Sequence, residues 1–282
     1  VKMKLRVLKN IVNKVSIILP DKIYLKLKFR YHLGYKLDLN HPKTFNEKLQ
    51  WLKLYDRNPS YINLVDKYKV RKYIAETIGK EYLIPIIGVY NDYQEINFFD
   101  LPNEFVLKPN HTSGDIYICK NKSKIDCYKL KRKIEKWLKK KYYWVHREWP
   151  YKYVKPRIIC EKYMVDESGE ELKDYKIFCF NGEPKLIQVD YNRFNGHKRN
   201  LYDIEWNYIP ISFHYPTYPN TIIKKPDKLS EMIELARLLS KDFSFVRVDF
   251  YYTEGKIYFG ELTFYPEAGF GKFSSENFEK KN

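Results

Sequence analysis

Residues 245–264 contain four polar side chains whose types and spacing suit chemistry on charged groups: Arg247, Asp249, Glu261 and Thr263. In the first half of this stretch apolar residues alternate with polar ones, which is the period of a half-buried β-strand. A similar alternation follows the sequence Glu-Gly-Lys. The stretch therefore predicts a β-hairpin with a charged face.

The turn of this hairpin decides which residues face each other. We expect a three-residue turn at 254–256, with its glycine at positive φ. Such a turn places Asp249 opposite Glu261, and Arg247 opposite Thr263. The returning strand has four residues of one parity, which we expect on one face: Ile257, Phe259, Glu261 and Thr263.

The two opposed acids constrain the chemistry of this face. Directly opposed residues have Cβ atoms only about 4.5–5.5 Å apart, so like charges there destabilise a sheet. Asp249 and Glu261 therefore need a cation. Mg²⁺ that arrives with substrate phosphates is bound through one or two carboxylates. From the hairpin alone, a metal site and a solvated strand face in which Arg247 neutralises both acids fit equally well.

Four other segments precede the hairpin in a recognisable order. Asp66-Lys67 opens a helix, and residues 105–109 form an apolar strand that ends in lysine and proline. Residues 158–164 and 175–182 are two further strand-like segments. In this order, and with the Arg-x-Asp and Glu-x-Thr pairs of the hairpin, the segments resemble the core of the ATP-grasp ligases.

Longer segments narrow the resemblance to the TupA-like branch, found among bacterial polysaccharide biosynthesis proteins. These segments are residues 40–55, 66–71 and 82–88. The similarity extends over roughly residues 35–275, nearly the whole chain. The order of the pieces carries the resemblance more than any one of them.

Helix and strand signals alternate along the chain, which predicts an α+β fold. Helices are expected at 125–141 and around 229–239, and Asn181-Gly182 predicts a type I′ hairpin. The resemblance implies an ATP-grasp fold, with two α+β lobes that clasp ATP and a small preceding domain. We expect three parts: an N-terminal helical region at 1–65, an N-lobe with the lid and phosphate loop at 66–160, and a C-lobe with the adenine hinge, metal site and acceptor pocket at 161–282.

The resemblance also implies ATP and Mg²⁺ as cofactors. It assigns Asp249, Glu261 and Thr263 to the metal, although the wider family usually carries Asn where this chain has Thr263. Arg247 is implied to stabilise the transferring phosphoryl group or the acylphosphate, since its planar fork matches both. Lys176 is implied to reach the γ-phosphate or the acceptor carboxylate.

Two lysines, Lys67 and Lys108, are implied to contact the phosphates of ATP. The 52 basic residues of the chain also allow either of them to be an ordinary surface lysine. Glu161 interrupts an apolar run and needs a partner, either the adenine amino group or a neighbouring lysine. The remaining implied nucleotide contacts are Ser113 and Gly114 in the phosphate loop, the backbone of Lys162 and Tyr163, and Asp166 at the ribose.

The segment 190–203 is polar, cationic and aromatic at once. Rings pack on sugar faces and arginine binds carboxylates, so we expect this segment to recognise an acidic sugar. Its candidate residues are Arg193, His197 and Arg199, with His197 as a possible base for the incoming amine. A plain basic surface loop is the alternative.

The composition limits the partners. With 52 Lys and Arg against 35 Asp and Glu, the chain has a formal charge of +17, which favours polyanions. The basic residues are spread along the chain and no nucleic-acid-binding signature appears, which argues against nucleic acid. Four cysteines without a C-x-x-C pair indicate a reducing compartment, the cytoplasm, and the histidines lack zinc spacing.

Residues 1–20 are basic and partly apolar, but their uncharged apolar run is too short for a signal sequence or a membrane span. A basic amphipathic segment resting on the inner membrane leaflet remains an alternative to a purely cytoplasmic protein. The oligomeric state is not encoded in any pattern that we identify.

The resemblance implies a carboxylate–amine ligase that forms an amide through an acylphosphate, joining an acidic sugar or amino acid to an amine in capsule or cell-surface polysaccharide synthesis. Three alternatives stay open. A kinase of the same fold would phosphorylate a hydroxyl; a glycosyltransferase would need an Asp-x-Asp motif, which this chain lacks; a non-catalytic polyanion-binding protein would bind in a strongly salt-dependent way.

Overall fold

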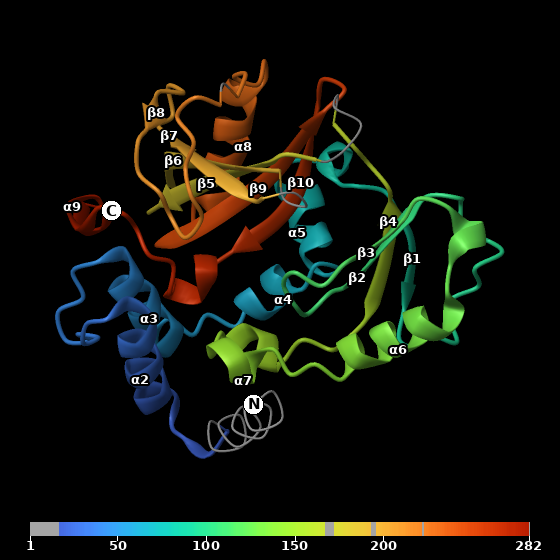
Figure 1. The fold of residues 1–282 in the computed structure, drawn as a ribbon, viewed down its shortest axis with the longest axis horizontal. Coiled ribbons are helices and arrows are strands. Elements are labelled where there is room, and N and C mark those ends of the chain that lie inside the picture. Colours follow the sequence, from blue (N-terminus) through green and yellow to red (C-terminus); the bar gives the residue numbers. More distant parts are fainter. Residues whose placement is uncertain (1–16, 167–171, 193–195, 222, 282) are drawn as a thin grey trace.

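The computed structural model of the chain describes residues 17–166, 172–192, 196–221 and 223–281, and it contains two β-sheets with helices around them (Figure 1). The four-stranded sheet has the order β1-β4-β2-β3 and the six-stranded sheet the order β10-β9-β5-β6-β7-β8. Neighbouring strands in both sheets run antiparallel. The predicted α+β class is confirmed.

The four-stranded sheet packs one face against a helix. Its strands are β1 (Ile86–Tyr90), β2 (Phe105–Pro109), β3 (Tyr117–Cys119) and β4 (Ile158–Lys162). Phe105 and Leu107 of β2 share a core with Leu130 and Ile134 of α6 (Cys127–Leu138). Because side chains alternate across a strand, the residues between them face away from α6. That second face is available for a polar site.

The six-stranded sheet packs one face against α8 (Leu229–Ser240). Its strands are β5 (Asp174–Phe180), β6 (Glu183–Tyr191), β7 (Lys198–Tyr202), β8 (Tyr208–Ile209), β9 (Phe245–Thr253) and β10 (Lys256–Thr263). Met232 and Ala236 of α8 are fully buried with Val246 and Val248 of β9. The predicted hairpin turn between β5 and β6 is present, with Asn181 and Gly182 both at positive φ.

The opposite face of this sheet is divided in two. At one end Phe45, the first residue of α3 (Phe45–Tyr55), contacts Phe178 and Phe245 with ring centroids 6.1 and 5.1 Å away. A capping box fixes the start of α3: Glu47 N donates to Thr44 Oγ1 at 3.2 Å, and Thr44 N donates to Glu47 Oε2 at 3.0 Å. The aromatic cluster covers this end only, so charged side chains can occupy the rest of the face.

The remaining helices connect and flank the sheets. They are α2 (Asp21–Leu33), α4 (Tyr61–Val65), α5 (Val70–Thr77), α7 (Tyr143–His146) and α9 (Glu276–Lys281), with 3₁₀ turns η1 (Lys80–Tyr82), η2 (Lys122–Lys124), η3 (Trp149–Lys152) and η4 (Pro266–Gly269). Among the described residues, no helix is both long enough and apolar enough to cross a membrane.

The β9–β10 hairpin corrects two details of the sequence prediction. Lys256 pairs with Thr253, so the turn contains two residues, Glu254 and Gly255, both at positive φ as in a type I′ turn. A bulge at Gly260 then shifts the register by one residue.

The bulge reverses the predicted parity of the returning strand. Ile257 and Phe259 belong to the core on the α8 side, whereas Glu261 lies opposite Asp249, on the other face. Thr263 lies opposite Arg247, as predicted. The predicted charged face is therefore correct, but it depends on the bulge and not on the turn.

We predict that Gly260→Val destabilises this hairpin. A Cβ at position 260 would lie 3.1 Å from Asp249 O and 3.2 Å from the Tyr251 ring, closer than normal packing. Overpacking of this kind lowers the free energy of unfolding by about 1–3 kcal/mol. Urea denaturation measures it, and Lys256→Val, at an exposed position of the same strand, serves as the control. Equal stability of the two variants would contradict the prediction.

Candidate active site

A row of charged side chains crosses the polar half of the six-stranded sheet. In the strand register Asp249 of β9 lies between Glu261 of β10 and Lys176 of β5. Lys176 in turn pairs with Gln188 of β6. Four adjacent strands thus bring together residues that are up to 85 positions apart in the sequence.

Arg247 holds the two acids of the hairpin from the same face. Its Nε and Nη2 atoms donate to Asp249 Oδ1 and Oδ2, both at 2.7 Å. Nη2 also donates to Thr263 Oγ1 at 3.1 Å and lies 3.6 Å from Glu261 Oε1. Burial alone would lower the pKa of the Arg247 guanidinium, but the paired Asp249 carboxylate raises it. Arg247 therefore stays charged in this network.

Lys176 is the second cation of the row and is only 5% exposed. Its Nζ donates to Asp249 Oδ2 at 2.8 Å and to Asp174 Oδ1 at 3.2 Å, and it lies 3.9 Å from Asp190 Oδ2. Burial would lower the pKa of Lys176, yet the surrounding carboxylates, Asp174 first, raise it. A charged lysine is thus held at the centre of three acids.

The row of ion pairs continues to strands β6 and β7. Arg199 of β7 donates through Nε to Asp190 Oδ1 at 2.6 Å and through Nη1 to Glu267 Oε1 at 2.9 Å. His197 Nε2 lies 3.5 Å from Asp190 Oδ1, and its ring stacks on Tyr215 with a centroid distance of 3.9 Å. Arg199 is 2% exposed and its guanidinium already pairs with protein acids, so its role in binding a substrate carboxylate stays a prediction. Arg193, the third candidate of this group, lies outside the described residues.

Glu267 is carried by a left-handed turn that the N-terminal helix α3 holds in place. Glu267, Ala268 and Gly269 have φ values of 49°, 53° and 65°. Left-handed backbone costs roughly 1–2 kcal/mol for each non-glycine residue, so other contacts must stabilise it. Lys53 Nζ donates to Ala268 O at 2.5 Å, and Gln50 Nε2 donates to Gly269 O at 2.6 Å. These bonds from α3 offset the strain and fix the direction of the Glu267 carboxylate.

The four-stranded sheet contributes a separate ion pair on the face turned away from α6. Lys108 Nζ lies 2.6 Å from Glu161 Oε2. Glu161 pairs in register with Val106, two residues from Lys108, so the two side chains are diagonal neighbours on one face. The partner that Glu161 requires is therefore the neighbouring lysine in this structure.

Lys67 contacts both the predicted phosphate loop and the charged row of the six-stranded sheet. Its Nζ donates to Thr112 O at 2.7 Å, within the predicted phosphate loop (residues 110–115), and lies 3.6 Å from Glu261 Oε2 on β10. Burial would raise the pKa of Glu261, but Lys67, Lys176 and Arg247 lower it to about 2. Glu261 is therefore ionised over the whole physiological range.

The predicted phosphate loop is anchored at its first residue and exposed at its tip. The Asn110 side chain donates to Asp66 Oδ1 at 2.9 Å and accepts a bond from Arg157 N at 2.7 Å. Ser113 and Gly114 at the tip are exposed, Gly114 has a φ of 78°, and Ser113 shares a hydrogen bond with Tyr142. Their role in phosphate binding stays a prediction.

The three residues expected around adenine and ribose follow the end of β4. Lys162 N donates to Pro85 O at 3.1 Å, and the Tyr163 ring lies 5.7 Å from Lys120 Nζ. Asp166 is 5% exposed, with its Oδ2 atom 2.5 Å from Lys173 Nζ. Their grouping around a nucleotide is also a prediction.

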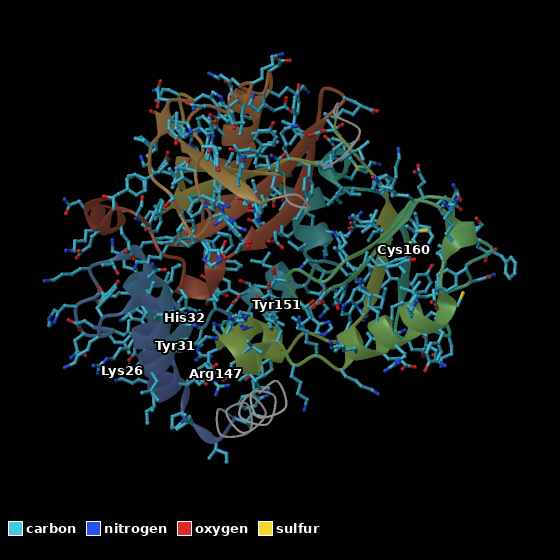
Figure 2. The ribbon with its side chains drawn as sticks, in the orientation of Figure 1. Lys26, Tyr31, His32, Arg147, Tyr151 and Cys160 are labelled. Atoms are coloured by element: carbon cyan, nitrogen blue, oxygen red, sulfur yellow. The ribbon has the colours of Figure 1, made fainter. Side chains whose placement is uncertain are left out.

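The sequence analysis missed a buried acid between the sheets. Glu148 is 5% exposed, and burial raises its pKa to about 7 although Lys53 opposes the shift. The charges of Glu261 and Lys67 also act on it. Nearby Tyr151 lies between the two sheets (Figure 2), and burial, Glu148 and Glu261 raise its pKa. The sequence Arg-Glu-Trp-Pro around Glu148 has no periodic pattern that would have identified it.

Asp190 and Glu267 were missed as site residues for a different reason. Asp190 lies inside the segment 190–203 together with its partner Arg199. Glu267 follows the hairpin and lies 68 residues from Arg199 in the sequence. Nothing in the spacing of single segments indicates that Arg199 binds both.

The hairpin acids suit a hard cation that brings its own oxygen ligands. No cluster of three or more His, Cys, Asp or Glu with metal-ligand geometry occurs among the described residues. Asp249, Glu261 and the Thr263 hydroxyl supply only oxygen donors on one face. Mg²⁺ prefers such donors and usually keeps waters and substrate phosphates as its other ligands. The donor set therefore fits Mg²⁺ that is bound together with a nucleotide and does not fit a metal cage.

Comparison with known proteins identifies one family. The family model described as TupA-like ATPgrasp matches residues 47–281. No curated protein matches the chain.

Several solved structures match the chain at low identity and with TM-scores below 0.5. D-alanine–D-alanine ligase from Bacillus anthracis with ATP has 14% identity and a TM-score of 0.43, covering 71% of this chain and 53% of that one. The Helicobacter pylori D-alanine–D-alanine ligase has 15% identity and a TM-score of 0.43, covering 79% and 63%. The ATP-grasp ligase PsnB, with a phosphomimetic precursor variant, Mg and ADP, has 9% identity and a TM-score of 0.42, covering 78% and 57%. The chain thus spans less than two thirds of the length of each.

We predict that Glu148→Gln stabilises the protein in a pH-dependent way. The carboxyl has a pKa of 4.5 when exposed and about 7 when folded. As the pH rises, the Glu148 carboxyl therefore ionises first in the unfolded state. The native protein loses free energy of unfolding between pH 4.5 and about 7, and it does not regain this stability at higher pH. The glutamine variant lacks this penalty, so its advantage in free energy of unfolding should grow from pH 4.5 to 7 and reach on the order of 2–3 kcal/mol.

Urea denaturation at several pH values measures this difference. Glu76→Gln, at an exposed side chain, is the control and should show no such trend. A difference between native protein and Glu148→Gln that is independent of pH would contradict the prediction.

Proposed function

The chain belongs to the TupA-like ATP-grasp family, as the resemblance predicted, and we propose that it is an ATP- and Mg²⁺-dependent ligase that joins a carboxylate to an amine. The single observation that carries this proposal is the row Glu261–Asp249–Lys176 with Arg247, a set of two acids and two cations on one sheet face in which all but the half-buried Glu261 are buried. Phosphoryl transfer needs little covalent help from a protein and depends mostly on positioned charge.

We assign the metal to Asp249 and Glu261, with Thr263 beside them. When bound, Mg²⁺ would neutralise the phosphate oxygens of ATP and make the γ-phosphorus a better electrophile. Lys67 would contact phosphate oxygens from its position between Thr112 O and Glu261. Lys108 would contact the phosphates from the other sheet, with Glu161 holding its ammonium group in place.

In the first step a carboxylate oxygen of the substrate attacks the γ-phosphorus, and the bond to ADP breaks. In the second step the amine nitrogen attacks the acyl carbon, phosphate leaves, and a proton is lost from nitrogen. We assign Arg247 and Lys176 to stabilise the negative charge that develops in both steps. Glu161, the backbone of Lys162 and Tyr163, and Asp166 are assigned to adenine and ribose, and Ser113 and Gly114 to the phosphates.

We further propose that the carboxylate belongs to an acidic sugar or an amino acid, and that the product enters capsule or cell-surface polysaccharide synthesis. We assign His197, whose Nε2 atom lies 3.5 Å from Asp190 Oδ1, to accept the amine proton. The supply of ATP and the four free cysteines favour a cytoplasmic reaction. A kinase would use the same charged row, so only the product separates it from a ligase.

We predict that Glu261→Gln weakens ATP binding in the presence of Mg²⁺ by at least about tenfold, because one of the two metal-binding carboxylates is lost. Isothermal titration calorimetry with and without Mg²⁺ measures the effect. Glu254→Gln, in the exposed turn of the same hairpin, should bind as the native protein does. A folded native protein that binds no nucleotide would refute both the ligase and the kinase.

We also predict that hydroxylamine traps the activated acid. With Mg²⁺-ATP and a panel of uronic acids and amino acids, a productive acid should give a hydroxamate and one ADP per turnover. Lys176→Met should lose this product, since it removes a central cation of the row. ADP release with a phosphorylated hydroxyl and no hydroxamate would instead establish the kinase.

A further inference from the structure

Helix α2 has an apolar stripe on the side that faces solvent. Ile23, Leu27 and Tyr31 are spaced by four residues, so they lie on one face, and their exposed fractions are 48%, 61% and 85%. The opposite face is part of the core, where Leu25 and Phe29 are fully buried. The exposed stripe is thus separate from the apolar face by which α2 packs against the core.

Exposed apolar residues are concentrated in this part of the chain. Of the 17 large apolar residues exposed in the described part, five lie between residues 17 and 31. Single exposed apolar residues are normal on a soluble protein, but a contiguous group points to an interaction surface.

Basic residues accompany the stripe on the exposed side. Lys22, Lys26 and Arg30 are all exposed and are spaced by four residues like the stripe itself. The one acid of α2, Asp21, is turned inward, where it accepts a hydrogen bond from Tyr143 and pairs with Arg147 at 3.1 Å. In Figure 2, Lys26 lies on the far side of α2 from Arg147. The outer surface of α2 is therefore apolar and cationic, without a carboxylate.

The charge of this surface limits what covers it. In a symmetric dimer through this face, Lys22, Lys26 and Arg30 would meet the same residues of the second copy, which like-charge repulsion disfavours. The first 20 residues of the chain contain five basic residues and no acidic one, so they would repel it as well. The occupant must be anionic on its surface and apolar beneath.

We propose that the outer face of α2 binds the surface of an anionic lipid bilayer. There the apolar side chains enter the boundary between headgroups and acyl chains while the basic ones contact lipid phosphates. The matched family segment begins at residue 47, so this surface lies outside the part that carries the ligase assignment. The proposal therefore stands or falls independently of the enzymatic activity.

Sedimentation with phosphatidylcholine vesicles, with and without phosphatidylglycerol, tests the proposal on the full chain. We expect binding to the anionic vesicles only. The variant with Ile23, Leu27 and Tyr31 all changed to Ser should bind at least about tenfold more weakly. The variant with Lys22, Lys26 and Arg30 changed to Gln should lose about fivefold for each charge removed.

The control is the double variant Phe99→Ser and Tyr128→Ser, whose side chains are 93% and 70% exposed in the region of the four-stranded sheet. It should bind as the native protein does. All substituted positions are exposed, and a thermal unfolding curve verifies that each variant is folded.

Three results would overturn the proposal: no binding of the native protein, equal binding to neutral and anionic vesicles, or equal losses in the control and α2 variants. Sedimentation velocity without lipid provides a further check. Self-association of the native protein that the serine variant abolishes, without vesicle binding, would assign the face to a second copy of the chain.

Discussion

Charge compensation on one face of the six-stranded sheet is the constraint on which the rest of the site depends. Asp249 is 2% exposed and an ionised carboxylate there is costly unless it is paired. Arg247 and Lys176 satisfy it from two sides, and Lys176 is in turn held by Asp174. Removing any one member leaves an unbalanced buried charge, so the row has to form as a unit.

The charged row is connected to the N-terminal helix α3 through a strained backbone turn. The left-handed turn at Glu267 and Ala268 would be unfavourable by itself, and Gln50 and Lys53 of α3 hold its carbonyl groups. A Cβ at Gly269 would lie 2.4 Å from Gln50 Nε2, so α3 approaches the turn closely. The segment at residues 40–55, which carries part of the family resemblance, therefore acts on the site by positioning Glu267, which in turn orients Arg199.

The sequence was sufficient for features that depend on local pattern. The alternation of Arg247 and Asp249, the type I′ turn at Asn181 and Gly182, and the helix around Leu130 all follow from periodicity and turn chemistry. The bulge at Gly260 does not follow from the local pattern. A glycine in a strand indicates a bulge or a close approach of another chain segment, but it does not determine how the register shifts. The parity of Ile257 and Phe259 was wrong for this reason. The long-range partners were equally hidden, since Lys176 lies 73 residues from Asp249 and Arg199 lies 68 residues from Glu267.

Lys67 is the cation that the phosphate loop and the hairpin share. Its ammonium group donates to Thr112 O and lies 3.6 Å from Glu261, so the two sheets meet at one side chain. Lys67 acts together with Lys176 and Arg247 to lower the pKa of Glu261. Any change in the distance between the sheets alters both contacts at once. The same lysine that would bind phosphate therefore also links the phosphate loop to the acid of the hairpin.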